Sequence, residues 1–275
     1  ADELPDEFIE KVRAAVKRVS PEKFLLGEVW EDATTKFGFN KRRTYLLGKG
    51  LDSVMNYPFK NAVLDFVKGK PAEQAMKEIL TICEHYPAPA MDTALNFLST
   101  HDTERALTVI ADEPANGRGR AWQSGRCVTG DAYEEGLLRL RMAYAIIYTL
   151  PGVPCLYYGD EIAMQGYRDP FNRAFFRWDA HEQRLRPVLA QLAQLRHTCE
   201  AFRTGQLRVL RAEDGILHYQ RVGKVETAEI IVNRTEHIIV ETLASGKSTE
   251  VNPMGFTIVV EEVGHNPDHS YYDYV

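Results

Sequence analysis

Apolar residues recur at helical spacing in five stretches of the chain. In the first stretch, positions 8, 9, 12, 16 and 19 are apolar, which places these side chains on one face of a helix. Pro151-Gly152 closes the fourth stretch, where a helix commonly ends. The five predicted helices cover residues 4–19, 59–69, 72–86, 133–150 and 182–198.

Four short apolar runs lie between these helices and predict buried strands. Runs of this length, bounded by turn residues, suit strands that are covered on both faces. Strands and helices in alternation indicate a parallel sheet with helices outside it. The runs are "KFLLGEVW" (23–30), "LDSVM" (51–55), "TALNFLST" (93–100) and "VPCLYYG" (153–159).

The pattern changes after Gly205. Residues 205–263 hold several short β-type runs separated by turn residues, such as "GILHYQRV" and "GFTIVVEEV". This pattern predicts an antiparallel β-sandwich of about 60 residues. We therefore expect an α/β domain over 1–204, the sandwich over 205–263, and a polar, aromatic tail over 264–275 that is ordered only if it docks.

Composition narrows the classes of partner. The chain has 275 residues, 44% hydrophobic and 26% charged, with a formal net charge of −6, which disfavours nucleic acid and anionic membranes. It holds no apolar run long enough for a membrane span and no secretory signal pattern, which favours a cytoplasmic protein. The four cysteines form no CxxC pair, so neither a zinc site nor a disulfide framework is predicted. His85, His181, His197 and His218 are predicted to be surface residues.

Chemically useful side chains follow three of the four predicted strands. In parallel α/β folds, catalytic groups sit just past the carboxyl ends of strands. Carboxylates, a histidine, an arginine and aromatic rings on one face suit a neutral, hydroxyl-rich ligand such as a sugar. These groups are Glu28 and Trp30, then His101 and Asp102, then Tyr157, Tyr158, Asp160 and Glu161, with Asp169 and Arg173 in the loop "GYRDPFNR".

The motifs "LLGEVWED", "FLSTHDTER" and "LPGVPCLYYGDEIAMQGYRDPFNR" resemble the α-amylase superfamily of retaining glycosidases. The likeness extends from residue 1 to about 263 and is strongest to the cyclomaltodextrinase, neopullulanase and maltogenic amylase branch. It implies that the α/β part is the second half of a (β/α)8 barrel, strands five to eight, followed by a C-terminal β-sandwich. It also implies action on α-glucan oligosaccharides.

The resemblance carries residue roles with it. Glu28 matches the general acid/base. His101 and Asp102 match the pair that holds the hydroxyls of the sugar being cleaved. Asp169 and Arg173 match a pair that binds the next sugar, and Trp30, with Glu3 less directly, matches the leaving-group side.

The family's nucleophile is an aspartate at the end of barrel strand four, followed by a segment like "VADE". Because this chain opens with "ADE", that aspartate would lie upstream of Ala1. A retaining glycosidase needs both carboxyls, so we expect the chain alone to be inactive. Asp2 is a remote alternative nucleophile. The partner would be the missing N-terminal barrel half, and open sheet edges favour self-association.

Several alternatives stay open. Asp102 could cap a following helix, Asp169 and Arg173 could merely pair with each other, and Asp160 and Glu161 are predicted to serve structure. No cofactor or metal is predicted, although calcium is common in the family. The chain could also be a non-catalytic carbohydrate-binding module, or part of a transglycosylase of the same superfamily.

Overall fold

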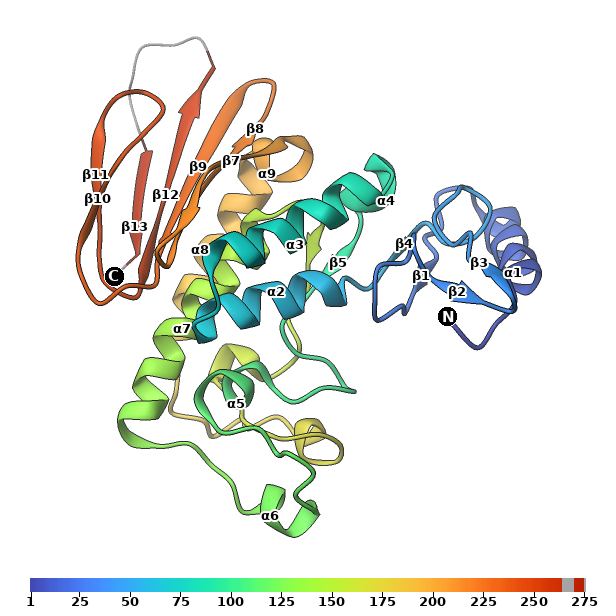
Figure 1. Ribbon diagram of the computed structural model, residues 1–275, viewed down its shortest axis with the longest axis horizontal. Coiled ribbons are helices and arrows are strands. Elements are labelled where there is room, and N and C mark those ends of the chain that lie inside the picture. Colours follow the sequence, from blue (N-terminus) through green and yellow to red (C-terminus); the bar gives the residue numbers. More distant parts are fainter. Residues whose placement is uncertain (264–269, 275) are drawn as a thin grey trace.

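The computed structural model describes residues 1–263 and the backbone of 270–274; residues 264–269 and 275 lie outside the described part (Figure 1). Its α-helices are α1 Asp6–Val19, α2 Tyr57–Lys68, α3 Ala72–His85, α4 Ala88–Asp92, α5 Ala106–Ala111, α6 Arg120–Ser124, α7 Gly130–Thr149, α8 Leu185–Thr198 and α9 Ala201–Thr204. Two 3-10 helices, η1 Asp160–Ile162 and η2 Phe171–Arg173, follow the fourth parallel strand.

The first part of the chain builds a narrow parallel sheet from β1 Leu26–Gly27, β4 Ser53–Val54, β5 Leu95–Asn96 and β6 Val153–Pro154. β1 pairs with β4 and β5 with β6, both in parallel. A parallel bridge between Met55 and Leu95 joins the two pairs. The order is therefore β1-β4-β5-β6, and the carboxyl ends of all four strands meet at one edge.

The predicted strands lie at the right places but are much shorter than the apolar runs suggested. The connection from β1 to β4 also differs from the expected alternation, because it holds no helix. It forms a small antiparallel hairpin of β2 Phe37–Gly38 and β3 Lys41–Arg42 instead. The turn at Phe39 and Asn40 has positive φ angles of 53° and 61°, which fits a tight hairpin turn.

Helix α2 is the central helix of the α/β part. Asn56 caps its start by accepting a hydrogen bond from the Phe59 amide, and Gly69, with a φ of 121°, ends it. It packs between α3 and α7, so that eight of its residues are buried, which is more than an amphipathic surface helix buries. The helix begins directly at the carboxyl end of β4, and its first turn therefore reaches the site described below.

The chain after Gly205 forms a five-stranded antiparallel sheet in the order β13-β12-β9-β8-β7. Its strands are β7 Gln206–Glu213, β8 Ile216–Val222, β9 Glu226–Asn233, β12 Gly255–Glu262 and β13 Ser270–Tyr274. A separate hairpin of β10 Ile239–Thr242 and β11 Ser248–Val251 covers one face through a small apolar cluster. Helices α3 and α7 contact the sheet on its other side, as Figure 1 shows.

The two parts share one continuous core. Apolar side chains of the helices and of the inner sheet face, among them Tyr219 and Ile230, belong to a single buried cluster. Arg221 is buried at this junction, where its guanidinium donates to the carbonyls of Gly205 and Thr149 at 2.7–3.1 Å. The sheet is thereby tied to the end of α7.

Part of the predicted tail forms secondary structure. Ser270–Tyr274 pairs with β12 as β13, while residues 264–269 and 275, which belong to the same prediction, lie outside the described residues. Among the described helices, none combines the length and the apolar character that a membrane span requires. The four cysteines are free thiols.

Candidate active site

Glu28 stands immediately after β1, at the edge where the parallel strands end. Its carboxylate accepts a hydrogen bond from the Tyr57 hydroxyl at 2.8 Å. The Tyr57 ring is buried and stacks on Trp30, with centroids 4.3 Å apart and planes inclined by 11°. Burial, with the neighbouring Glu28 carboxylate, raises the pKa of Tyr57 well above its ordinary value, so the hydroxyl stays a donor.

Tyr57 owes its position to a buried amide chain across the strand ends. Asn56 donates to the side-chain oxygen of Asn96 at 2.9 Å, and Asn96 donates to the Pro151 carbonyl at 2.7 Å. Both asparagines are fully buried, so these bonds are shielded from water. Because Asn56 also caps α2, the chain fixes where the helix begins and aims Tyr57 at Glu28.

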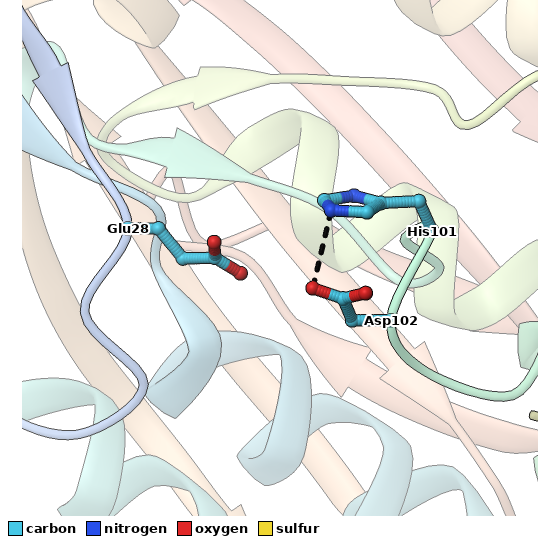
Figure 2. A group of neighbouring side chains, drawn as sticks. All are labelled: Glu28, His101 and Asp102. Carbon is cyan, nitrogen blue, oxygen red and sulfur yellow. Dashed lines mark ion pairs between the residues drawn. The ribbon is translucent and has the colours of Figure 1, made fainter. Parts of the chain in front are cut away.

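His101 and Asp102 lie in the turn after β5 and face Glu28. His101 Nε2 is 3.1 Å from Asp102 Oδ2, and one donor atom from each of Glu28, His101 and Asp102 lies within 4.8 Å of the others. Figure 2 shows the Glu28 and Asp102 carboxylates pointing toward one another from separate loops, with the imidazole beside them. The three predicted site residues therefore meet in space.

The loop after β6 forms hydrogen bonds with the turn that carries His101 and Asp102. Arg173 donates to the His101 carbonyl at 2.9 Å and to Asp102 Oδ1 at 3.0 Å, and it also pairs with Asp169 at 3.1 Å. Asp169 and Arg173 thus form the ion pair that the sequence allowed. Arg173 also joins them to the catalytic candidates.

Asn172 is a site residue that the sequence reasoning missed. It is fully buried, and its amide nitrogen donates to the carbonyls of Thr100 at 3.2 Å and of His101 and Thr103 at 2.8 Å. It therefore holds the main chain of the turn that carries His101 and Asp102. Its place inside the motif "GYRDPFNR", beside Arg173, was the available signal.

The helix-cap alternative for Asp102 is wrong. Helix α5 begins only at Ala106, and its first amide is capped by the hydroxyl of Ser99 at 2.8 Å. The Asp102 carboxylate is instead engaged by Arg173 and His101. It is therefore oriented toward the site.

The contacts of Asp160 indicate a structural role. It is buried, accepts a hydrogen bond from Tyr144 at 2.6 Å and pairs with the buried Arg105 at 3.1 Å. Burial raises the pKa of Asp160, although the contacts with Tyr144 and Arg105 act in the opposite direction. Arg105 also lies over the rings of Tyr157 and Tyr158, each centroid 4.8 Å away, so the pair supports the strand end.

Two N-terminal candidates lie outside the group of Glu28, His101 and Asp102. Asp2 is held by Tyr45 and Lys36, at 2.8 Å from each, and Glu3 is exposed. The surface prediction for His218 is wrong: this side chain is buried between Glu229 and Glu241 in the C-terminal sheet. Its sequence context, "ILHYQ", alternates as a strand and could have indicated an inward position.

The arrangement combines a half-buried carboxylate, a second carboxylate with a bound arginine, an imidazole and an exposed indole. Such a set can donate or accept a proton and hold several hydroxyl groups. Among the described residues, Glu28, His101 and Asp102 also form the one group whose donor atoms could reach a metal ion together.

The chain matches the family described as "Alpha amylase, catalytic domain" over residues 4–204. It is 32% identical over 241 residues to a cyclomaltodextrinase of Geobacillus thermopakistaniensis, covering 86% of this chain and 36% of the relative. It is 30% identical over 258 residues to neopullulanase 2 of Thermoactinomyces vulgaris, covering 90% and 39%. The chain thus spans little more than a third of these relatives.

Solved structures agree with the fold. A cyclic α-maltosyl-(1→6)-maltose hydrolase from Arthrobacter globiformis superposes with a TM-score of 0.78 at 24% identity, over 94% of this chain and 54% of that one. A cyclomaltodextrinase structure gives 0.72 at 30% identity, over 88% and 37%.

Proposed function

Since the chain belongs to the alpha-amylase family, we propose that it forms the acid/base half of a retaining α-glucan hydrolase. The observation that carries this proposal is the meeting of Glu28, His101 and Asp102 at the carboxyl edge of the parallel strands. Catalytic groups of barrel enzymes occupy this edge.

In this proposal, β1, β4, β5 and β6 are strands five to eight of a (β/α)8 barrel, and residues 205–263 form its C-terminal β-sandwich. The parallel order of the four strands supports the assignment. The divide at 204/205 is supported by the change from helices to antiparallel strands, which begins with β7.

Glu28 acts first as the acid that protonates the departing glycosidic oxygen and then as the base that activates water. Tyr57 holds one oxygen of Glu28, so the other is left to handle the proton. His101, Asp102 and Arg173 bind hydroxyls of the sugar being cleaved and its neighbour. The exposed face of Trp30 stacks against the leaving-group sugar, and Glu3 lies on that side.

The substrates are maltooligosaccharides, cyclodextrins or pullulan, as the names of the related cyclomaltodextrinase and neopullulanase suggest. The attacking carboxylate is supplied by a segment that pairs with the free edge of β1. Residues 1–275 alone therefore bind α-glucan without cleaving it.

Calorimetric titration with maltotriose and β-cyclodextrin tests the proposal, together with an assay of reducing-sugar release. We expect saturable binding without turnover, and weaker binding in His101→Ala. Glu22→Gln, an exposed change that precedes β1 whereas Glu28 follows it, serves as the matched control. Failure to bind either sugar would refute the sugar site. Sugar release that Glu28→Gln abolishes would refute the missing-nucleophile part.

A further inference from the structure

We propose that Glu28, His101 and Asp102 also bind a divalent transition-metal ion, with Zn²⁺ as the best-fitting member, and that this ion excludes the sugar. The metal site stands on the geometry of the three side chains alone. The exclusion of sugar rests on the proposed function.

The spacing of two donors already suits zinc. In a tetrahedral site with Zn–N and Zn–O distances of about 2.0–2.1 Å, neighbouring ligand atoms lie about 3.3 Å apart. His101 Nε2 and Asp102 Oδ2 are 3.1 Å apart. Glu28 completes the set after a shift of at most about 1.5 Å, because its donor atom is within 4.8 Å of both. A water molecule takes the open fourth position that such three-ligand zinc sites keep.

The side chains can make this adjustment. His101 is 52% exposed and Asp102 is 36% exposed, so their rotation does not disturb the core. Glu28 and Asp102 come from different loops and point toward one another (Figure 2). A cation bound between them would attract the oxygen atoms of both carboxyl groups.

Each carboxylate also has an outer partner that orients it. Tyr57 holds Oε1 of Glu28 at 2.8 Å, and Arg173 holds Oδ1 of Asp102 at 3.0 Å. Outer partners of this kind fix metal ligands in place. The positive charge of Arg173 opposes a cation, however, so we expect a site weaker than a structural zinc site.

The donor set selects the metal. An imidazole nitrogen with two carboxylates suits Zn²⁺ and its transition-metal neighbours, whereas Ca²⁺ requires six to eight oxygens.

Two other histidines meet carboxylates but do not offer the same site. His85 Nδ1 pairs with Asp32 on the surface, and no third donor joins them within the described part of the chain. His218 meets Glu229 and Glu241 through opposite ring nitrogens, so one ion cannot reach all three.

Calorimetric titration of residues 1–275 with ZnCl₂, and separately with CaCl₂, tests the proposal. We expect one zinc ion whose affinity falls by more than about a hundredfold in both His101→Ala and Glu28→Gln, because the loss of an outer partner alone costs about 10–100-fold. His85→Ala, the matched control, keeps that ion, and calcium does not bind there. Thermal melts followed by circular dichroism check that each variant is folded. Glu28→Gln keeps the shape of the side chain at a half-exposed position, so the test remains valid if His101→Ala does not fold. Zinc binding unchanged in Glu28→Gln would overturn the proposal.

Maltotriose titration of the zinc-loaded chain separates the metal site from the proposed function. We expect the maltotriose affinity to fall by at least about tenfold, because both ligands need the same donors. Zinc binding that leaves maltotriose affinity intact keeps the metal site and removes the shared site. If zinc binds but maltotriose does not bind at all, the metal site is supported and the proposed sugar site is refuted.

Discussion

Replacing Asn172 should weaken both the fold and the sugar site, because this one amide holds the turn that carries His101 and Asp102. Its nitrogen donates to the carbonyls of Thr100, His101 and Thr103. In Asn172→Ala these donors disappear. The His101 carbonyl keeps its bond from Arg173 at 2.9 Å.

The carbonyls of Thr100 and Thr103 lose the Asn172 donor in a buried setting. A buried polar group without its partner costs about 1–3 kcal/mol, so the two carbonyls together should lower the free energy of unfolding of Asn172→Ala by about 2–6 kcal/mol. Asn172→Asp keeps the shape but turns a negatively charged group toward three carbonyl oxygens. Its cost should exceed that of alanine, because a buried charge without a partner is strongly destabilising.

Urea denaturation followed by tryptophan fluorescence measures the stability, and maltotriose titration at a temperature where each variant is folded measures the site. Asn61→Ala, at an exposed position of α2, is the matched control and should change neither quantity by more than about 0.5 kcal/mol. A loss below about 0.5 kcal/mol in Asn172→Ala, or equal effects of alanine and aspartate, would refute the reasoning. Reduced stability with unchanged maltotriose affinity would limit Asn172 to a structural role.

Three further predictions concern other parts of the molecule. Tyr57→Phe keeps the stacking on Trp30 but removes the hydrogen bond to Glu28, so urea denaturation should show a loss of about 1 kcal/mol, and no loss would contradict the contact. Burial by itself would raise the pKa of Glu229, but hydrogen bonds from His218 and from the other partners of Glu229 hold this pKa below its usual value. The ionised Glu229 therefore stabilises the fold at pH values above its unfolded pKa of about 4.3. This stabilisation is lost as the pH falls through the lower pKa of the folded state. The urea midpoint should accordingly fall less between pH 6 and about pH 3 in Glu229→Gln than in the wild type, and parallel curves would count against it. Sedimentation velocity should reveal association that rises with concentration, because β1 and β6 expose open edges; a single monomeric species throughout would contradict it.

The sequence located the strands because their apolar runs are bounded by turn residues. It located Glu28, His101 and Asp102 because these polar residues directly follow those runs. The same rule applied to the second run would have found Tyr57, which comes two residues after Met55. Tyr57 was missed because it falls between the predicted strand 51–55 and the predicted helix 59–69, whereas in the structure it is the first residue of α2.

Other features depend on long-range contacts that no local pattern contains. His218 is buried because Glu229 and Glu241, on two other strands, supply partners for its ring nitrogens. The hairpin of β2 and β3 is anchored by Arg43, which reaches Asp6 and the Leu4 carbonyl far back in the chain. Strand length was overestimated because apolar character records burial, whereas pairing depends on how neighbouring strands diverge.

The position of Arg221 bears on how this polypeptide can be divided. Its guanidinium bonds to Gly205, at the start of the β-rich part, and to Thr149, at the end of a helix. Truncation at residue 204 would strip α3 and α7 of their apolar cover and invite aggregation. A shortened version intended for crystallisation or for engineering should therefore retain the sheet as part of a single folding unit.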